Sequence, residues 1–442
     1  MSNVLPRWPD TDRDRARLTR FTFLLHLRPV RVPLRTLRWT HTCGLGGTSL
    51  VLLLLLVASG TLQMLVYQPV PTVAYDSVLA LQQQTAFGPL VRGIHYWSAN
   101  LLVLVVLLHT ARVVLTGGHQ GPRRVTWLLG AALLLGILAS SFSGYLLPWD
   151  QLSYWAVTIA TGMLGYVPLV GEPLRRVALG GETIGDATLV NFYTVHTTLV
   201  PVMLLLLAAW HFWRVRRAGG VVVPPAAAGE TEPDGEPAKV MFWPELMVRE
   251  IAQALVVVAV VMVLAALLGA PLGERANPGM SPNPAKAPWY FVGFQELLIH
   301  LHPVFAVLVL PLLGALGLVL LPWLTPDDTP GGRWFLSARG RRISAAAALA
   351  ALIATPLLVM LDEWGGDGST GWLSGGVLPL AGIAGACWGC LVLARRRGAT
   401  GAEAVQAVVV LLGVAFVVLT VIGVWFRGAG MALGWPWAGG GA

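Results

Sequence analysis

The chain has 442 residues, of which 55% are hydrophobic and only 12% are charged, and its formal net charge is +8. So much apolar surface cannot be buried in a water-soluble core, so the composition excludes a soluble globular protein and indicates a membrane protein. In a membrane protein basic residues first report topology, and we therefore expect no nucleic acid as a partner.

The N-terminal segment, residues 1–40, is rich in arginine and has no apolar stretch long enough to cross a bilayer. Residues 15–38 alternate Arg with Phe and Leu, which predicts an amphipathic helix on the inner membrane surface, in contact with lipids. A cleavable signal peptide is not expected, because no small-residue cleavage site follows a short apolar core.

Nine apolar runs are long enough to span a bilayer. Inside lipid only a helix or a closed barrel satisfies its own backbone, and none of these runs alternates as barrel strands do. The sequence therefore predicts an all-α polytopic membrane protein with about nine transmembrane helices. The runs cover approximately residues 46–67, 95–116, 126–147, 190–213, 249–270, 304–324, 342–362, 375–394 and 404–426.

The positions of the basic residues predict the orientation. With a cytoplasmic N-terminus, most of the 30 Lys and Arg residues fall on inner segments and inner helix ends, as the positive-inside rule requires, and nine spans place the C-terminus outside.

Residues 217–245, rich in Pro, Gly, Ala and Glu, predict a flexible linker after the four-span region 41–216. A rear part follows, comprising residues 246–325 and the additional transmembrane helices of residues 326–442.

Four of the nine histidines lie inside predicted spans, His95 and His109 in the second and His196 and His211 in the fourth. Ionisable side chains are costly in lipid and point to function. On a helix, each pair is separated by roughly 21–22 Å along the axis and by only about 40–60° around it. Because the two spans run in the same direction, His95 comes level with His196 near the outer side, and His109 with His211 near the inner side.

Two facing imidazoles at one level can bind a haem iron from both sides, so the histidines predict two b-type haems in a front four-helix bundle. A zinc site would need more ligands at one level. The alternative is four unrelated histidines, each hydrogen-bonded within a core.

Glycines and arginines accompany the histidines. A glycine lets a large macrocycle approach the helix backbone. Arg92 and Arg112, at the two ends of the second span, either neutralise haem propionates or extend to the lipid headgroups. The glycines occur in pairs fourteen residues apart, Gly46 with Gly60 in the first span and Gly130 with Gly144 in the third.

Several segments resemble, in the right order, the cytochrome b of Rieske/cytochrome b complexes, the bc and bf family. They are GGTSLVLLLLLVASG, RGIHYWSAN followed by LLHTARVVLTGG, GYLLPWDQLSYWAV and NFYTVHTTLVP. The fourteen residues between His196 and His211 are similar to the branch in which cytochrome b is a shorter four-helix polypeptide with a separate small subunit. Here both parts form one chain, and the resemblance fades after about residue 325.

The resemblance implies a subunit of a quinol:cytochrome c, or related acceptor, oxidoreductase. In this family quinol is oxidised at the outer side, where one electron passes to a Rieske iron-sulfur protein. The other passes through the outer haem (His95 and His196) and the inner haem (His109 and His211) to an inner quinone-reduction site, contributing to proton translocation. A cytochrome c-type subunit or acceptor, a homodimeric complex and a bacterial-type energy-transducing inner membrane are also implied.

The family's outer quinol pocket lies between the elbow Pro-Trp-Asp and the loop after the fifth span. Carried over to this chain, the quinone-binding residues are Tyr145, Pro148, Trp149, Trp289 and Tyr290. Trp149 is expected to anchor at the membrane interface.

The chain departs from the family at the glutamate that accepts a quinol proton. Where relatives have Pro-Glu-Trp-Tyr, residues 287–290 read Ala-Pro-Trp-Tyr. Quinol oxidation needs a base, and we predict that Glu296 takes over this role, with Asp150, His300 and His302 as further candidates. The alternative is an interfacial glutamate that faces solvent.

Two inner-side residues are also implied by the resemblance. Cys43 stands where some members hold an extra haem, a haem c, covalently, although it lies one residue farther from Gly46 than in the pattern. Arg216 is similar to a residue that lines the inner quinone-reduction site, or it is an ordinary inner-side arginine.

Two other functions remain open. A di-haem b anchor of a quinone-linked dehydrogenase or reductase, without a Rieske partner, would share the histidine pattern but not the elbow or the Trp289-Tyr290 loop. A non-redox transporter would lack any b-type absorption band.

Overall fold

The computed structural model describes residues 11–22, 29–226, 237–365 and 371–435. In this part of the chain nine helices are long and apolar enough to cross a membrane, which confirms the predicted all-α polytopic fold. Their central segments are α3 (Leu45–Met64), α5 (Gly88–Leu115), α6 (Arg124–Tyr145), α10 (Val200–Arg217), α11 (Met247–Leu268), α13 (Leu310–Leu324), α14 (Ala338–Gly365), α15 (Leu378–Arg396) and α16 (Gly401–Val421).

Shorter helices connect these spans. The fourth span begins with α9 (Asp186–Thr194), which continues through Val195–Leu199 into α10. The others are α4 (Ala74–Gln83), α7 (Gln151–Leu164), α8 (Gly171–Leu179) and α12 (Trp289–His300).

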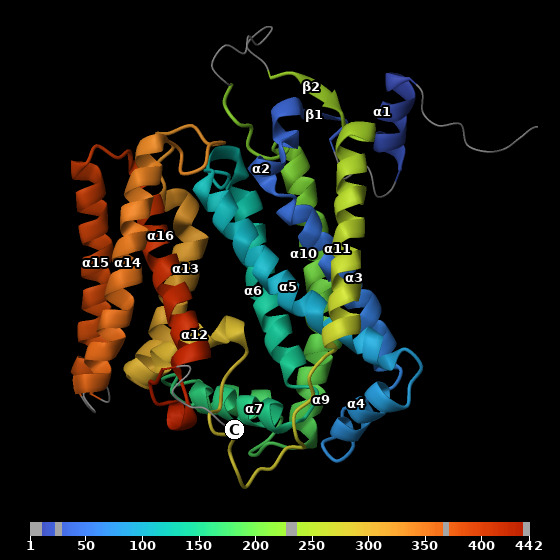
Figure 1. The fold of residues 1–442 in the computed structure, drawn as a ribbon, viewed down its shortest axis with the longest axis vertical. Coiled ribbons are helices and arrows are strands. Elements are labelled where there is room, and N and C mark those ends of the chain that lie inside the picture. The colour runs from blue at the N-terminus through green and yellow to red at the C-terminus, as the bar shows by residue number, and fades with distance from the viewer. Residues whose placement is uncertain (1–10, 23–28, 227–236, 366–370, 436–442) are drawn as a thin grey trace, which may run out of the picture.

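The long helices form two groups that lie side by side (Figure 1). In the first group α3 packs along α5 and α6 packs along α10, and α11 packs against both α5 and α3. In the second group α16 packs against α14 and α15, while α12 packs against α16 and α13 contacts α6. The fifth span therefore joins the front bundle, although it follows the linker in the sequence.

The two ends of the bundle carry different elements. α2 (Trp39–Thr42), β1 (Arg31–Pro33) and β2 (Lys239–Met241) lie at one end, here called the α2 end, and α4 and α7 lie at the opposite end, the α7 end (Figure 1). The bundle interior between them is apolar. Its buried residues are Leu52, Leu53, Leu102, Val103, Val106, Leu134, Ile137, Val200, Leu204, Ala208 and Val261.

The single amphipathic helix predicted for residues 15–38 is wrong in its second half. α1 spans only Asp12–Phe21, and β1 then pairs antiparallel with β2, Val32 opposite Val240. Pro29 and Pro33 cannot donate backbone hydrogen bonds, and β-branched Val30 and Val32 favour extended backbone. Residues 1–10 and 23–28 of this segment, and 227–236 of the predicted linker, lie outside the described residues.

Candidate functional site

His95 and His196 face each other near the α7 end of the bundle. Their ring centroids are 6.2 Å apart and their planes are inclined by 72°. This separation is close to that expected, about 6 Å, when two imidazole nitrogens bond one metal atom from opposite sides at about 2.0 Å each. Nδ1 of His95 lies 3.0 Å from Ser59 Oγ, and Nδ1 of His196 lies 3.0 Å from the Ser140 carbonyl oxygen. Because neighbouring helices engage both Nδ1 atoms, Nε2 of each ring is left for a metal.

His109 and His211 form a second pair toward the α2 end. The two side chains interact electrostatically, and they come from the same two spans as the first pair. The structure thus brings the four predicted histidines together as two couples at two depths.

Each of these rings lies against a glycine of a neighbouring helix. α3 supplies the glycines that face the two histidines of α5, and α6 supplies those that face the two histidines of the fourth span. A Cβ atom built on Gly46 would lie 3.4 Å from Cε1 of His109, and one built on Gly60 would lie 3.0 Å from Cε1 of His95. A Cβ atom built on Gly130 would lie 3.3 Å from Cε1 of His211, and one built on Gly144 would lie 2.4 Å from Cε1 of His196. The donor set and the missing Cβ atoms fit two haems, each held by two histidines.

The two arginines predicted near the haems have different surroundings. Arg112 is buried; its Nε donates to the His41 carbonyl oxygen at 3.0 Å, and its Nη2 has no hydrogen-bond partner within the described chain. A buried guanidinium with an unused donor suits an anionic group such as a haem propionate. Arg92 instead donates to the carbonyl oxygens of Ala270 and Pro271, at 2.7 and 2.6 Å, and ties α5 to the segment after α11.

Cys43 and Arg216 both lie at the α2 end. Cys43 ends α2 in a left-handed conformation, with φ of 47°, is half-buried, and interacts electrostatically with Arg112. Arg216 is half-buried in the last turn of α10. Cys43 is therefore placed beside the buried Arg112, at the same end of the bundle as the His109–His211 pair.

The elbow between α6 and α7 is a packed element. Trp149 has a positive φ of 53°, is only 6% exposed and meets Tyr154 edge-on, with ring centroids 5.9 Å apart. It packs in a buried cluster with Leu146 and Val157. The expectation that Trp149 anchors at the membrane interface is corrected, because the turn at Pro148 folds α7 back over the indole ring.

Asp150 caps α7. Its Oδ1 accepts hydrogen bonds from Ser153 N at 2.9 Å and Ser153 Oγ at 2.6 Å, and its Oδ2 accepts one from Gly273 N at 2.9 Å. Both carboxylate oxygens are therefore engaged in holding the elbow to the segment after α11.

Aromatic residues of α6 and α12 meet beside this elbow. Tyr145 interacts electrostatically with Tyr290 and with Tyr96, the neighbour of His95, and Phe142 meets Phe291 with ring centroids 6.0 Å apart. The indole Nε1 of Trp289 donates to Asn100 Oδ1 at 2.9 Å. Tyr96 and Asn100 were not predicted from the sequence, although both follow His95 within the motif RGIHYWSAN.

Glu296 lies about 120° around α12 from Tyr290 and about 140° from Phe291, and so on a different side of the helix from these two rings. It is fully buried, lies beside Gly423 in the segment after α16, and pairs with Arg427 rather than with solvent. Burial by itself raises the pKa of Glu296, but hydrogen bonds from His300 and Arg427 outweigh it and hold the pKa below its ordinary value. His300 contacts Glu296, whereas the ring of His302 packs against Phe305 and Trp372.

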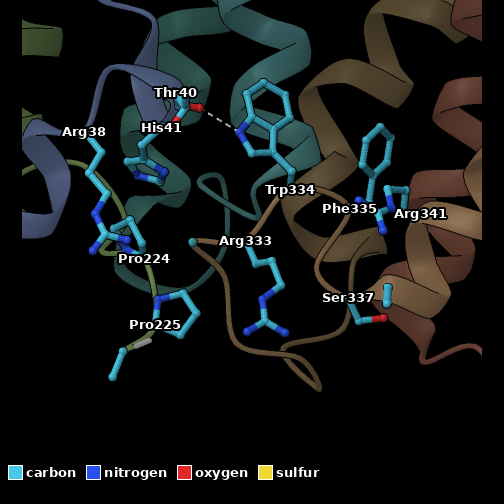
Figure 2. Close-up of a pocket in the computed structure, with 13 residues that line it drawn as sticks. Arg38, Thr40, His41, Pro224, Pro225, Arg333, Trp334, Phe335, Ser337 and Arg341 are labelled. Carbon is cyan, nitrogen blue, oxygen red and sulfur yellow. Dashed lines mark hydrogen bonds between the residues drawn. The ribbon is translucent and has the colours of Figure 1, made fainter. Parts of the chain in front are cut away.

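A cavity of about 590 Å³ opens at the α2 end, away from the His95–His196 pair. Figure 2 shows Arg38, Arg333 and Arg341 around it, and Trp334, whose Nε1 donates to the Thr40 carbonyl oxygen at 3.0 Å. The cavity contains none of the four paired histidines, so it is separate from the predicted haem sites.

Gly144→Ala is expected to lower the haem content, because its new Cβ would lie 2.4 Å from His196 Cε1 and displace the ring. The haem-to-protein ratio of the purified protein measures this. Gly46→Ala should have a weaker effect, since its Cβ would lie at an ordinary 3.4 Å from His109 Cε1. Gly47→Ala is the matched control, because a Cβ there meets nothing within 4 Å. Equal haem content in all three variants would contradict the expected order.

Comparisons with known proteins identify the family of the chain. The family model Cytochrome b/b6/petB matches residues 35–219. The chain is 42% identical over 175 residues to cytochrome b6 of Synechococcus sp. (strain JA-3-3Ab), covering 40% of this chain and 81% of the relative. It is 41% identical over 175 residues to cytochrome b6 of Prochlorococcus marinus (strain NATL1A), covering 40% of this chain and 80% of the relative.

A solved structure extends the likeness beyond this region. A chain of a hyperthermophilic respiratory Complex III matches with a TM-score of 0.64 and 22% sequence identity. The match covers 89% of this chain and 93% of that chain, so the fold is shared over most of both.

Proposed function

The chain belongs to the cytochrome b/b6 family, and it is a multi-pass membrane subunit of a quinol oxidoreductase that binds b-type haem. We propose that it carries two such haems and oxidises quinol at the outer membrane face. The observation that carries this proposal is the pairing of four histidines at two depths of one bundle, each ring against a glycine.

The haems, bound at these two levels, supply one-electron transfer across the membrane. His95 and His196 hold the outer haem, and His109 and His211 hold the inner one. Ser59 and Ser140 fix the outer rings through Nδ1, and the buried donor of Arg112 serves a propionate. The apolar interior between the two histidine levels excludes water, so protons and ions do not pass along the bundle.

The outer quinol site lies between the elbow and α12. Tyr145, Pro148, Trp149, Trp289 and Tyr290 form its walls, and the buried elbow makes the first wall rigid. Burial raises the pKa of Tyr290, so its phenol stays neutral and donates a hydrogen bond to a quinol oxygen. Oxidation of one quinol releases two electrons and two protons, and Glu296 accepts one of these protons in place of the glutamate that the family carries before Trp289.

The inner quinone-reduction site lies at the α2 end, where Arg216 assists quinone binding. Cys43 is placed to hold a covalent haem c beside Arg112 at the same level. The α2 end thus faces the cytoplasm in a bacterial-type inner membrane, with the N-terminus inside and the C-terminus outside.

The proposed partners follow from the family. A Rieske iron-sulfur protein takes the first quinol electron and passes it to a cytochrome c-type subunit or acceptor, within a homodimeric complex. The fold likeness to a chain of a respiratory Complex III supports an assembly of this kind.

A redox-titrated optical spectrum of the purified complex tests the function. We expect b-type bands that titrate as two components of different potential, because one haem lies near each membrane face. An iron-sulfur signal in the same preparation separates this function from that of a di-haem anchor without a Rieske partner. A spectrum without b-type bands would overturn the proposal.

A further inference from the structure

A buried ionic cluster joins α12 to the segment that follows α16. Arg427 is buried, and its Nε lies 2.9 Å from Glu296 Oε1 and 3.1 Å from Oε2, while its Nη2 lies 2.6 Å from Oε1. Arg427 Nη1 also pairs with Glu363 of α14 and donates to the Met431 carbonyl oxygen. One guanidinium therefore holds two carboxylates.

His300 extends this cluster to a second carboxylate of α14. Its Nε2 lies 3.2 Å from Glu296 Oε1, and its Nδ1 lies 2.7 Å from Asp362 Oδ2. Side-chain exposure rises along this series, from 0% at Glu296 to 11% at His300 and 40% at Asp362. The three groups form a continuous hydrogen-bonded chain from the interior to the surface.

The charges of the cluster favour an exchangeable proton on His300. Glu296 on α12 and Asp362 and Glu363 on α14 are three carboxylates, against the single guanidinium of Arg427. Burial by itself lowers the pKa of His300, but its hydrogen bonds to Glu296 and Asp362 outweigh this and raise it above its ordinary value. The ammonium group of Lys286, whose Nζ donates to the Val424 carbonyl oxygen at 2.9 Å, also interacts with Glu296.

Both protonation states of His300 have hydrogen-bond partners. In the protonated ring Nε2 donates to Glu296, and in the neutral ring the same nitrogen accepts from Arg427 Nη2, which lies 3.1 Å away. The ring can therefore gain and lose a proton without leaving a buried polar atom unpaired. A purely structural ion pair between Arg427 and Glu296 would need neither His300 nor Asp362.

We propose that Glu296, His300 and Asp362 form the outlet by which a proton from quinol oxidation reaches the outer aqueous phase. The proposal rests on the proposed function, in which Glu296 accepts a quinol proton. That proton reaches His300 at Nε2, and the proton on Nδ1 leaves to Asp362 and then to water, so one proton enters the ring as another leaves. The second quinol proton and both electrons take other routes.

The geometry of α12 defines how the outlet begins. Tyr290 and Glu296 are six residues apart, which on a helix is about 9 Å along the axis and about 120° around it. Transfer into Glu296 therefore runs through water beside α12 rather than by direct contact with quinol. His300 and Asp362 do not contact quinol; they carry the proton onward from Glu296.

Two adjacent carboxylates on α14 offer a matched test. Asp362→Asn removes the acceptor on His300, whereas Glu363→Gln removes a carboxylate that contacts Arg427 and not His300. In the complete complex, we expect Asp362→Asn to lower kcat for quinol oxidation by roughly tenfold or more and to change its pH profile. Glu363→Gln should stay within about twofold of the parent, and Asp362→Glu should restore most of the lost rate.

A third variant separates this proposal from the function on which it rests. Glu296→Gln removes the proton acceptor and should slow quinol oxidation by roughly one to three orders of magnitude at normal haem content. If it does so while Asp362→Asn and Glu363→Gln behave alike, the outlet is overturned and Glu296 keeps its role. If Glu296→Gln leaves turnover unchanged, the acceptor role fails, and the outlet fails with it.

Discussion

Replacement of His196 by alanine is expected to remove one of the two proposed b-type haems and to leave the other. The ring centroids of His95 and His196 are 6.2 Å apart, so deleting one imidazole would leave the iron proposed between them with a single protein ligand. The His109–His211 pair lies 14 and 15 residues farther along the same two spans and keeps both rings. The haem-to-protein ratio should fall by about half, and the surviving bands should titrate as one component.

His119 supplies the control for this experiment. It is a buried histidine that lies outside both pairs and whose Nε2 is 3.2 Å from Thr325 Oγ1. His119→Gln should keep both haems. A His196→Ala protein with the full complement of haem would contradict the pairing on which the proposed function depends.

Arg427→Met should destabilise the protein by about 3–5 kcal/mol, because it leaves the fully buried Glu296 carboxylate without its guanidinium partner. Thermal unfolding of the purified complex measures the loss. The double variant Arg427→Met with Glu296→Met should recover much of this stability, since it removes both buried charges together.

An exposed ion pair provides the comparison. Arg275 pairs with Asp76, and both side chains are 52% exposed, so Arg275→Met should cost less than about 1 kcal/mol. If the Arg427 and Arg275 variants lose equal stability, or if the double variant is no better than Arg427→Met, burial of the pair is not what stabilises it.

The pH dependence of this loss has a definite sign. The folded protein holds the pKa of Glu296 below its ordinary value, so the contribution of this group to stability is present at neutral pH and is lost as the pH falls through that lowered pKa. In Arg427→Met, burial raises the pKa of the same group instead. The deficit of the variant should therefore shrink as the pH falls through the raised pKa of its Glu296, above the ordinary value of about 4.3, and on through the lowered pKa of the parent.

The local features of the sequence were sufficient for the membrane helices and for the histidine couples. The length of an apolar run identifies a membrane span without knowledge of its neighbours. The fixed rise and rotation per residue of a helix place His95 and His109 on one side of their span, and His196 and His211 on one side of theirs. The glycine pairs follow the same period, which is why the structure finds each glycine beside a histidine ring.

The second half of the N-terminal segment departed from its predicted helix because two prolines and a strand partner from residues 239–241 outweighed its amphipathic pattern.

Only the tertiary structure decided which partner each polar group meets. Arg92 bonds carbonyl oxygens 178 and 179 residues farther along the chain, and Glu296 meets an arginine 131 residues away. Trp149 is buried because α7 folds back over it, and α11 joins the front bundle across the linker. Sequence periodicity fixes the direction in which a side chain leaves its own helix. The group that it meets depends on how helices distant in the sequence pack together. This packing places Glu296, an isolated glutamate in the sequence, in an ionic cluster.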